Sequence, residues 1–178
     1  MAALAFVFLA LPATAADYKA EDYAALLKAL PSAKHNLVEV IGEVTKGGEV
    51  AIEAKFEMDK TDLMVGAYTS EKGLAADAEH NVFKEYNGVS TGAAWKAEIE
   101  VFKDFGHIAR SAQYHTLLSI TKLKLLDIIA KAANDRPGTV FEIKALVENG
   151  AAIFSVLVAH DGTMSRVTYD LVTGSRKT

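Results

Sequence analysis

The second half of the chain shows a helical pattern of hydrophobic residues followed by strand-like ones. Across residues 119–134, apolar side chains recur at spacings of three and four, which predicts an amphipathic helix with Ser119 or Thr121 as its cap. Asn-Gly and Asp-Gly pairs, typical of tight hairpin turns, separate the apolar segments that come next. The pattern predicts three antiparallel strands, over residues 139–147, 151–159 and 164–172.

The first half repeats this order of elements. Residues 36–45 place four apolar side chains on one helical stripe, and the Gly47-Gly48 pair ends the helix. Residues 49–58 then alternate strictly between apolar and polar positions, which predicts a half-buried strand. Two further strands are expected over residues 63–69 and 81–86, the second after an insertion that the other half lacks.

The two halves align with each other in sequence. Residues 37–41 match residues 125–129 at an offset of 88, and Gly48 and Val50 match Gly138 and Val140 at an offset of 90. A helix followed by strands, present twice, predicts an α+β fold built from two tandem repeats, each a helix packed on an antiparallel sheet. Each repeat has about 55 residues, a marginal size for independent folding, so we expect the two to share a core or to pack tightly.

The N-terminus has the pattern of a secretory signal. An unbroken apolar run from Ala3 to Leu11 precedes a small-residue cleavage pattern, so we expect residues 1–15 to be a signal peptide removed after Ala15. No Lys or Arg precedes the run, which leaves open a start upstream of Met1, and a short buried helix or strand is the alternative. Residues 18–30 then predict a short amphipathic helix. The expected location is periplasmic or secreted.

The residues of the second half resemble those of the PepSY domain. The resemblance is best over residues 119–174, in PGTVFEIKALVENG, FSVLVAHDG and VTYDLVTG, and a degraded copy covers residues 32–92. It implies an extracytoplasmic module with a binding or inhibitory role, often toward peptidases, and no catalytic residues. The expected organisation is a first repeat with its N-terminal helix over residues 17–92, a linking segment over 93–118 with one further strand or helix, and a second repeat over 119–178.

Composition and charge narrow the classes of function. The 178 residues have a net charge of −4 and no cysteine, which argues against a general nucleic-acid binder and excludes thiol or disulfide chemistry. Past the N-terminal run, no stretch approaches 18 apolar residues, so no membrane span is expected in the mature chain. The charge is uneven: residues 17–104 carry 17 acids and 10 bases, whereas residues 105–178 carry 6 acids and 9 bases.

The sequence has no recognisable catalytic pattern. The five histidines form neither an HExxH nor a His-x-His motif, and Gly-x-Ser-x-Gly and Walker patterns are absent. We therefore expect a non-enzymatic protein with no required cofactor.

Acidic residues at a predicted hairpin tip form the one candidate metal site. Glu57, Asp59 and Asp62 supply the oxygen ligands that calcium or a lanthanide ion prefers, and Asp77 and Glu79 in the insertion could add to them. Asp17, Glu21 and Asp22 are further candidates near the mature N-terminus. The alternative is a charged turn that protects a sheet edge from aggregation.

Two functions follow from this sequence. The first is a binding or regulatory module that engages a protein partner, such as a peptidase or an envelope protein, with an exposed sheet edge adding a strand to the partner. The second is a periplasmic metal-binding protein that coordinates a hard cation through carboxylates of the acidic half.

Overall fold

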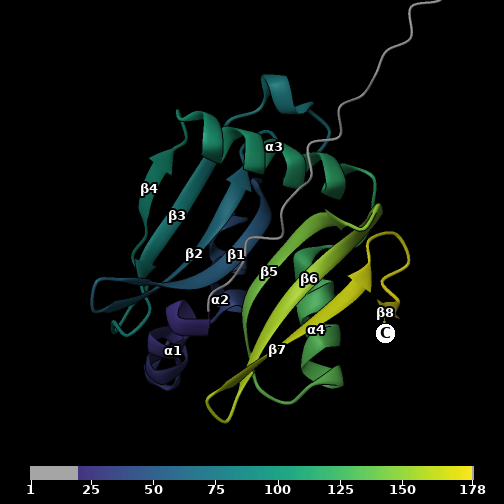
Figure 1. Ribbon diagram of the computed structural model, residues 1–178. Helices are drawn as coiled ribbons and strands as arrows, with labels where there is room; N and C mark the ends of the chain where they lie inside the picture. The colour runs from purple at the N-terminus through teal and green to yellow at the C-terminus, as the bar shows by residue number, and fades with distance from the viewer. Residues whose placement is uncertain (1–19, 178) are drawn as a thin grey trace, which may run out of the picture.

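The computed structural model describes residues 20–177, so the expected signal peptide and Asp17 lie outside the described residues. Its eight strands form one antiparallel sheet in the order β4-β3-β2-β1-β5-β6-β7-β8 (Figure 1), which confirms the predicted α+β class. The strands are β1 (Val50–Asp59), β2 (Asp62–Ser70), β3 (Phe83–Val89), β4 (Glu98–Val101), β5 (Thr139–Glu148), β6 (Ala151–His160), β7 (Thr163–Asp170) and β8 (Arg176–Lys177).

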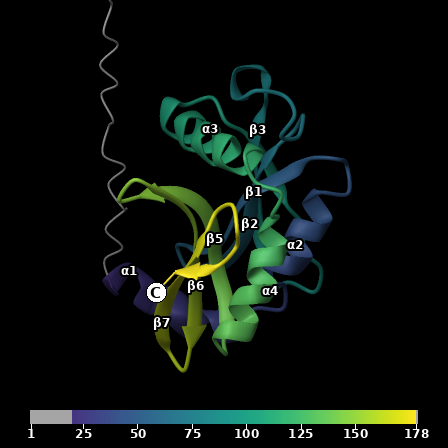
Figure 2. The ribbon, with the colours of Figure 1, turned by 90° about the vertical axis from the view of Figure 1, so that its right-hand side faces the viewer.

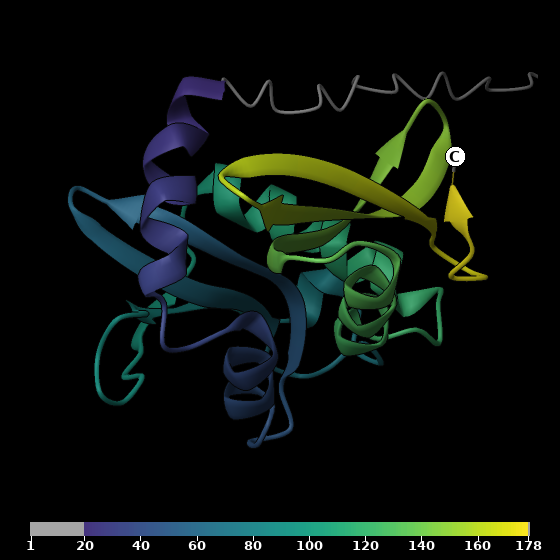
Figure 3. The same ribbon diagram turned by 90° about the horizontal axis from the view of Figure 1, so that it is seen from below.

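Helices pack on both faces of this sheet. Two amphipathic helices lie side by side on one face (Figure 2), while a third crosses the opposite face over β1 and β5. A further helix stands across one end of the sheet (Figure 3), where the Tyr23 ring meets the edge of the Phe141 ring. The pair on one face is α2 (Leu37–Val44) and α4 (Leu125–Asp135), the helix on the opposite face is α3 (Phe105–Ser119), and the helix across the end of the sheet is α1 (Ala20–Ala29). Two 3-10 turns complete the described helices, η1 (Leu30–Ser32) and η2 (Ala78–His80).

The two halves of the chain join at the middle of the sheet. β1 and β5 pair antiparallel, with Ala54 opposite Ile143 and one Glu–Lys pair on each side. Apolar residues from both halves form one buried cluster, so the halves share a core, as their short lengths predict. A helix followed by antiparallel strands occurs in each half. The PepSY resemblance and the repeat interpretation built on it stay predictions.

The segment between the halves differs from the expectation. Residues 93–118 contain both a strand, β4, and nearly all of α3, instead of one further element. The helix expected from Ser119 begins at Leu125, because Ser119 is the last residue of α3. The Asp127 carboxylate accepts the backbone N–H of Lys124 at 2.8 Å, which fixes the start of α4 at this later point.

A β-bulge interrupts each central strand. The register of β1 with β2 shifts between Ala51 and Glu53, and that of β5 with β6 shifts between Val140 and Glu142. The strict alternation expected over residues 49–58 therefore fails, and Ile52 and Glu53 are both buried. The bulges place Glu53 and Glu142 on the sheet face that α3 crosses.

Candidate interaction surface

A row of polar side chains runs across the α3 face of the sheet. Its members are opposite one another in register on successive strands, and so lie on one face. From β6 to β4, the row is Ser155, Lys144, Glu53, Tyr68, Glu85 and Glu100. A second row lies two residues further along each strand, on the same face of the sheet. In the same strand order, it is Leu157, Glu142, Lys55, Gly66, Asn87 and Glu98.

Opposite charges meet where the two halves join. Glu53 is opposite Lys144, and Lys55 is opposite Glu142. Each lysine also binds a carboxylate on its own strand: Lys144 Nζ lies 2.6 Å from Glu142 Oε1, and Lys55 Nζ lies 2.5 Å from Glu57 Oε2. Bases and acids are therefore matched at the centre of the sheet.

Glu53 is the most deeply buried carboxylate of these rows. It is 3% exposed, and its Oε2 atom has no hydrogen-bond partner. Burial raises the pKa of Glu53 to about 7, although the nearby charges of Lys144 and Lys55 act to lower it. Such a carboxyl group is easily neutralised near neutral pH.

Toward β4 the only charged residues in the two rows are acids. Glu85 lies opposite Glu100, a like-charge pair, and Glu98 lies opposite Asn87. Burial raises the pKa of Glu85, and the charges of Glu57 and Glu100 add to that rise, while Lys55 and His107 oppose it. This outer part of the face is therefore short of positive charge.

β4 is an edge strand with an open side. All four of its residues are exposed, Ile99 at 59% and Val101 at 44%. Just past the strand, the Phe102 N–H donates to the Phe83 carbonyl at 3.0 Å. Because hydrogen-bonded and non-bonded pairs alternate in an antiparallel ladder, the backbone groups of Ile99 and Val101 must point away from β3. The free edge thus presents two sets of backbone donors and acceptors, each on an apolar residue.

Exposed apolar side chains are concentrated near this edge. Among residues 23–177, half of the exposed large hydrophobic side chains lie between Val89 and Ile108. Phe105, the first residue of α3, is 86% exposed, and α3 begins beside the end of β4 (Figure 1). Apolar surface of this kind beside a free edge is typical of a protein-binding site.

The opposite edge of the sheet has a different character. β8 consists of Arg176 and Lys177 only, and it pairs with two residues of β7. A very short strand with basic side chains is a common way to prevent pairing with another chain. β8 covers only Thr168 and Tyr169, so among the described residues the stretch 163–167 of β7 is a second length of edge without a paired strand. β4 is the better candidate of the two because its outward-pointing residues, Ile99 and Val101, are both apolar and exposed.

The structure separates the five candidate metal ligands into two groups. Asp59 and Asp62 lie opposite each other where the β1–β2 hairpin turns, whereas Asp77 precedes η2, beyond the other end of β2. The length of β2 alone places these groups about 25 Å apart. The five carboxylates therefore do not converge on one site.

Several of these carboxylates already have partners. Glu57 binds Lys55 and accepts a hydrogen bond from the Asn87 side chain at 2.7 Å. The Asp77 side chain caps η2 by accepting the backbone N–H of His80, and it also binds the His80 ring. Glu79 is exposed in the same turn. Within residues 20–177, no group of three or more His, Cys, Asp or Glu side chains is arranged to hold a metal ion. Calcium or lanthanide binding stays a prediction.

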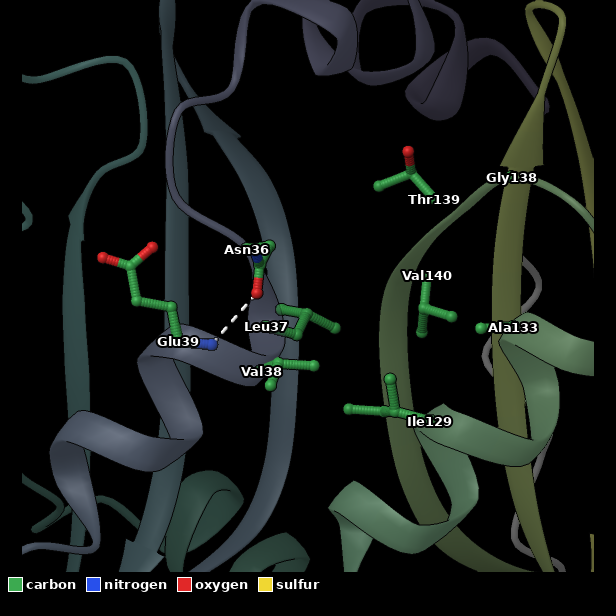
Figure 4. A pocket seen from close by; sticks show the side chains of 9 residues that line it. All are labelled: Asn36, Leu37, Val38, Glu39, Ile129, Ala133, Gly138, Thr139 and Val140. Atoms are coloured by element: carbon green, nitrogen blue, oxygen red, sulfur yellow. Dashed lines mark hydrogen bonds between the residues drawn. The ribbon is translucent and has the colours of Figure 1, made fainter.

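A groove of about 570 Å³ lies on the other face, between α2 and the α4–β5 connection. Figure 4 shows apolar side chains from both sides lining it, among them Val38, Ile129 and Val140. The polar groups at its rim are engaged in the fold, since Asn36 caps α2 and Glu39 binds His35. The groove thus offers shape and apolar surface, but little polar chemistry to select a ligand.

Sequence reasoning did not identify the β4 edge as a site. The alternation of Glu98, Ile99, Glu100 and Val101 is a period-two signal, but it lies in a segment where a single strand or helix was expected. Neither its place at the sheet edge nor the burial of Glu53 can be inferred locally. Both depend on the pairing of β3 with β4 and on the position of α3.

Comparisons with known proteins identify no relative of known function. No family model matches the chain, and no curated protein matches it. A crystal structure of a provisionally assigned lipoprotein from Clostridium difficile 630 is similar with a TM-score of 0.41 and 12% identity, over 82% of this chain and 92% of that one. Within the described residues, none of the helices has the length and hydrophobicity that a bilayer span requires.

Proposed function

We propose that this protein is a non-enzymatic, periplasmic or secreted binding module that engages an extended segment of a protein partner, such as a peptidase, at the free edge of β4. The observation that carries the proposal is the open side of this strand, where Ile99 and Val101 direct their backbone groups away from β3 and expose apolar side chains on the adjacent sheet face. An added strand gains main-chain hydrogen bonds from such an edge, and adjacent side chains provide selectivity.

The proposal makes a specific prediction for proline substitution. In Val101→Pro the missing N–H is one that points away from β3, so the β3–β4 pairing should remain while strand addition is blocked. Val101→Thr keeps the N–H and is the matched control. Unchanged far-ultraviolet circular dichroism and melting temperature would show that both variants fold.

Cross-linking identifies the segment to be tested. One variant carries a photoreactive residue at Ile99, and a control variant carries it at Arg176 on the opposite edge. Each variant is irradiated in an envelope extract, and the cross-linked peptides are identified by mass spectrometry. A synthetic peptide of the segment captured only at Ile99 is then titrated against the two variants. We expect Val101→Thr to bind and Val101→Pro to lose at least about tenfold in affinity. Equal binding by both variants, or no segment captured specifically at Ile99, would contradict strand addition at β4.

A further inference from the structure

The side chains around the β4 edge indicate which kind of strand it accepts. Glu98 and Glu100 point to the α3 face, where Glu85 is already opposite Glu100. Ile99 and Val101 point to the other face, beside Tyr86 and Lys84. A strand added to β4 would continue both rows, so its side chains would alternate between an acidic and an apolar surface.

The charge of the acidic row is not matched within the described part of the fold. At the centre of the sheet each acid is opposite a lysine, but Glu85, Glu98 and Glu100 have no base opposite them in register. Lys84 on the neighbouring position of β3 points to the other face and binds Glu49 and Glu71. A basic side chain on an added strand would supply the missing partner for Glu100, and a second one would lie opposite Glu98.

A second copy of this chain does not fit the edge. In an antiparallel pair of two β4 strands, Ile99 and Val101 of one copy would form backbone hydrogen bonds with the same two residues of the other copy. The neighbouring glutamates of one copy would then lie opposite glutamates of the other. Like charges directly opposite on a sheet are destabilising. Self-association through β4 is therefore disfavoured by the same residues that favour a basic partner.

We infer that β4 selects an extended protein segment in which basic residues alternate with apolar ones, with two basic side chains opposite Glu98 and Glu100. This inference rests on the proposed function and specifies the chemistry of the partner. Lys96 and Lys103, both exposed, lie just beyond the two ends of β4, which limits the acidic stretch to these two positions.

Three heptapeptides test the inference. One alternates Lys with Val, one alternates Gln with Val, and one alternates Glu with Val; each carries a fluorophore and is titrated at low salt by fluorescence anisotropy. Opposite-charge cross-strand pairs contribute roughly 0.2–1 kcal/mol each, so two pairs of about 0.7 kcal/mol correspond to a roughly tenfold lower Kd for the Lys peptide than for the Gln peptide. The double variant Glu98→Gln, Glu100→Gln should lose this preference, as should wild type in 1 M salt, where the Debye length falls to about 3 Å.

The outcomes separate the inference from the proposed function. If all three peptides bind wild type equally and Val101→Pro abolishes binding, strand addition holds and the charge preference is wrong. If the Lys peptide binds Val101→Pro as well as Val101→Thr, the charges attract the peptide without strand addition, and the proposed mode is wrong. If no peptide binds at millimolar concentration, both fail. Only a Lys preference that requires Glu98 and Glu100, in a complex that Val101→Pro abolishes, supports both.

Discussion

At the scale of single residues, the most unusual group is the carboxyl of Glu53. It lies at the joint between the two halves, opposite Lys144 on β5. Two residues of α3, Arg110 and the buried Tyr114, are close enough to interact with it electrostatically. The Ser111 hydroxyl, like Glu53 Oε2, is buried without a hydrogen-bond partner. Since an unpaired buried charge is costly, folding favours the protonated carboxyl.

This burial predicts how stability changes with pH. The pKa of Glu53 is about 7 in the folded protein, against an ordinary value of 4.5 for a glutamate, so the folded state holds an extra proton between these pH values. The contribution of Glu53 to stability is therefore greatest below about pH 4.5 and is lost as the pH rises through 7. A shift of this size corresponds to roughly 3 kcal/mol.

The variant Glu53→Gln, which resembles the protonated form, should remove this dependence. Chemical denaturation at pH 5 and pH 8 measures the free energy of unfolding of both proteins. The value for the variant minus that for wild type should be about 2–3 kcal/mol higher at pH 8 than at pH 5. Asp59→Asn, at the exposed end of the same strand, is the control. A difference between Glu53→Gln and wild type that stays constant with pH would show that the buried carboxyl does not titrate in this range.

At the scale of elements, two glycines make opposite contributions. Gly42 lies on the exposed side of α2, where an added Cβ would meet no other atom within 4 Å. Gly138 precedes β5 with a φ of +136°, and an added Cβ would lie 2.2 Å from the Ala159 carbonyl oxygen. The first position therefore tolerates a side chain, and the second requires glycine.

Alanine at these two positions should change stability in opposite directions. Gly42→Ala should raise the free energy of unfolding by about 0.5–1 kcal/mol, through the higher helix propensity of alanine. Gly138→Ala should lower it by at least about 1–3 kcal/mol, since it combines a strained backbone with a clash against β6. Urea denaturation measures both changes, and a stabilised Gly138→Ala would contradict the geometry of the β5 entry.

Hairpins were the elements easiest to predict from the sequence. The Asn149-Gly150 and Asp161-Gly162 pairs each have positive φ at both residues, as a tight turn of the expected type requires, and β5, β6 and β7 follow with bounds close to those predicted. For α3 the sequence left a helix and a strand as alternatives, because the hydrophobic periodicity of the helix is weak and it covers a face with many polar side chains. Its one local signal is Asp104, whose side chain caps the helix by accepting the His107 N–H.

At the scale of the whole molecule, the decisive contact is the pairing of β1 with β5. Sequence patterns predict each strand but not this pairing, because residues 87 to 91 positions apart give no local signal of register. Two separate small sheets would satisfy the same patterns. The β1–β5 pairing also determines the charge balance of the α3 face, because it brings Lys144 opposite Glu53 and Glu142 opposite Lys55, while the β3–β4 pairing leaves the acids near β4 without a lysine opposite them.

One sheet with one core predicts cooperative unfolding. Trp95, the single tryptophan, lies in the linking segment and reports on the first half, because its indole N–H donates to the Val65 carbonyl of β2 at 3.1 Å. Leu171 is buried in the second half, and Leu171→Ala should cost about 2–5 kcal/mol. If the halves unfold together, Trp95 fluorescence and far-ultraviolet circular dichroism should both report the same lowering of the melting temperature, by about 10 °C. A fluorescence transition that stays unshifted would mean that the halves unfold separately.

The difference between the two sheet edges also determines how many partner segments one chain can bind. A fibre grows only when each added subunit offers a fresh adhesive edge for the next one. Here β4 is open, while β8 is a two-residue strand of Arg176 and Lys177. The two edges therefore present different surfaces, and β8 blocks its edge at Thr168 and Tyr169. A segment that fits β4 meets no second site of the same kind on the described residues, so complexes should saturate at one partner segment per chain.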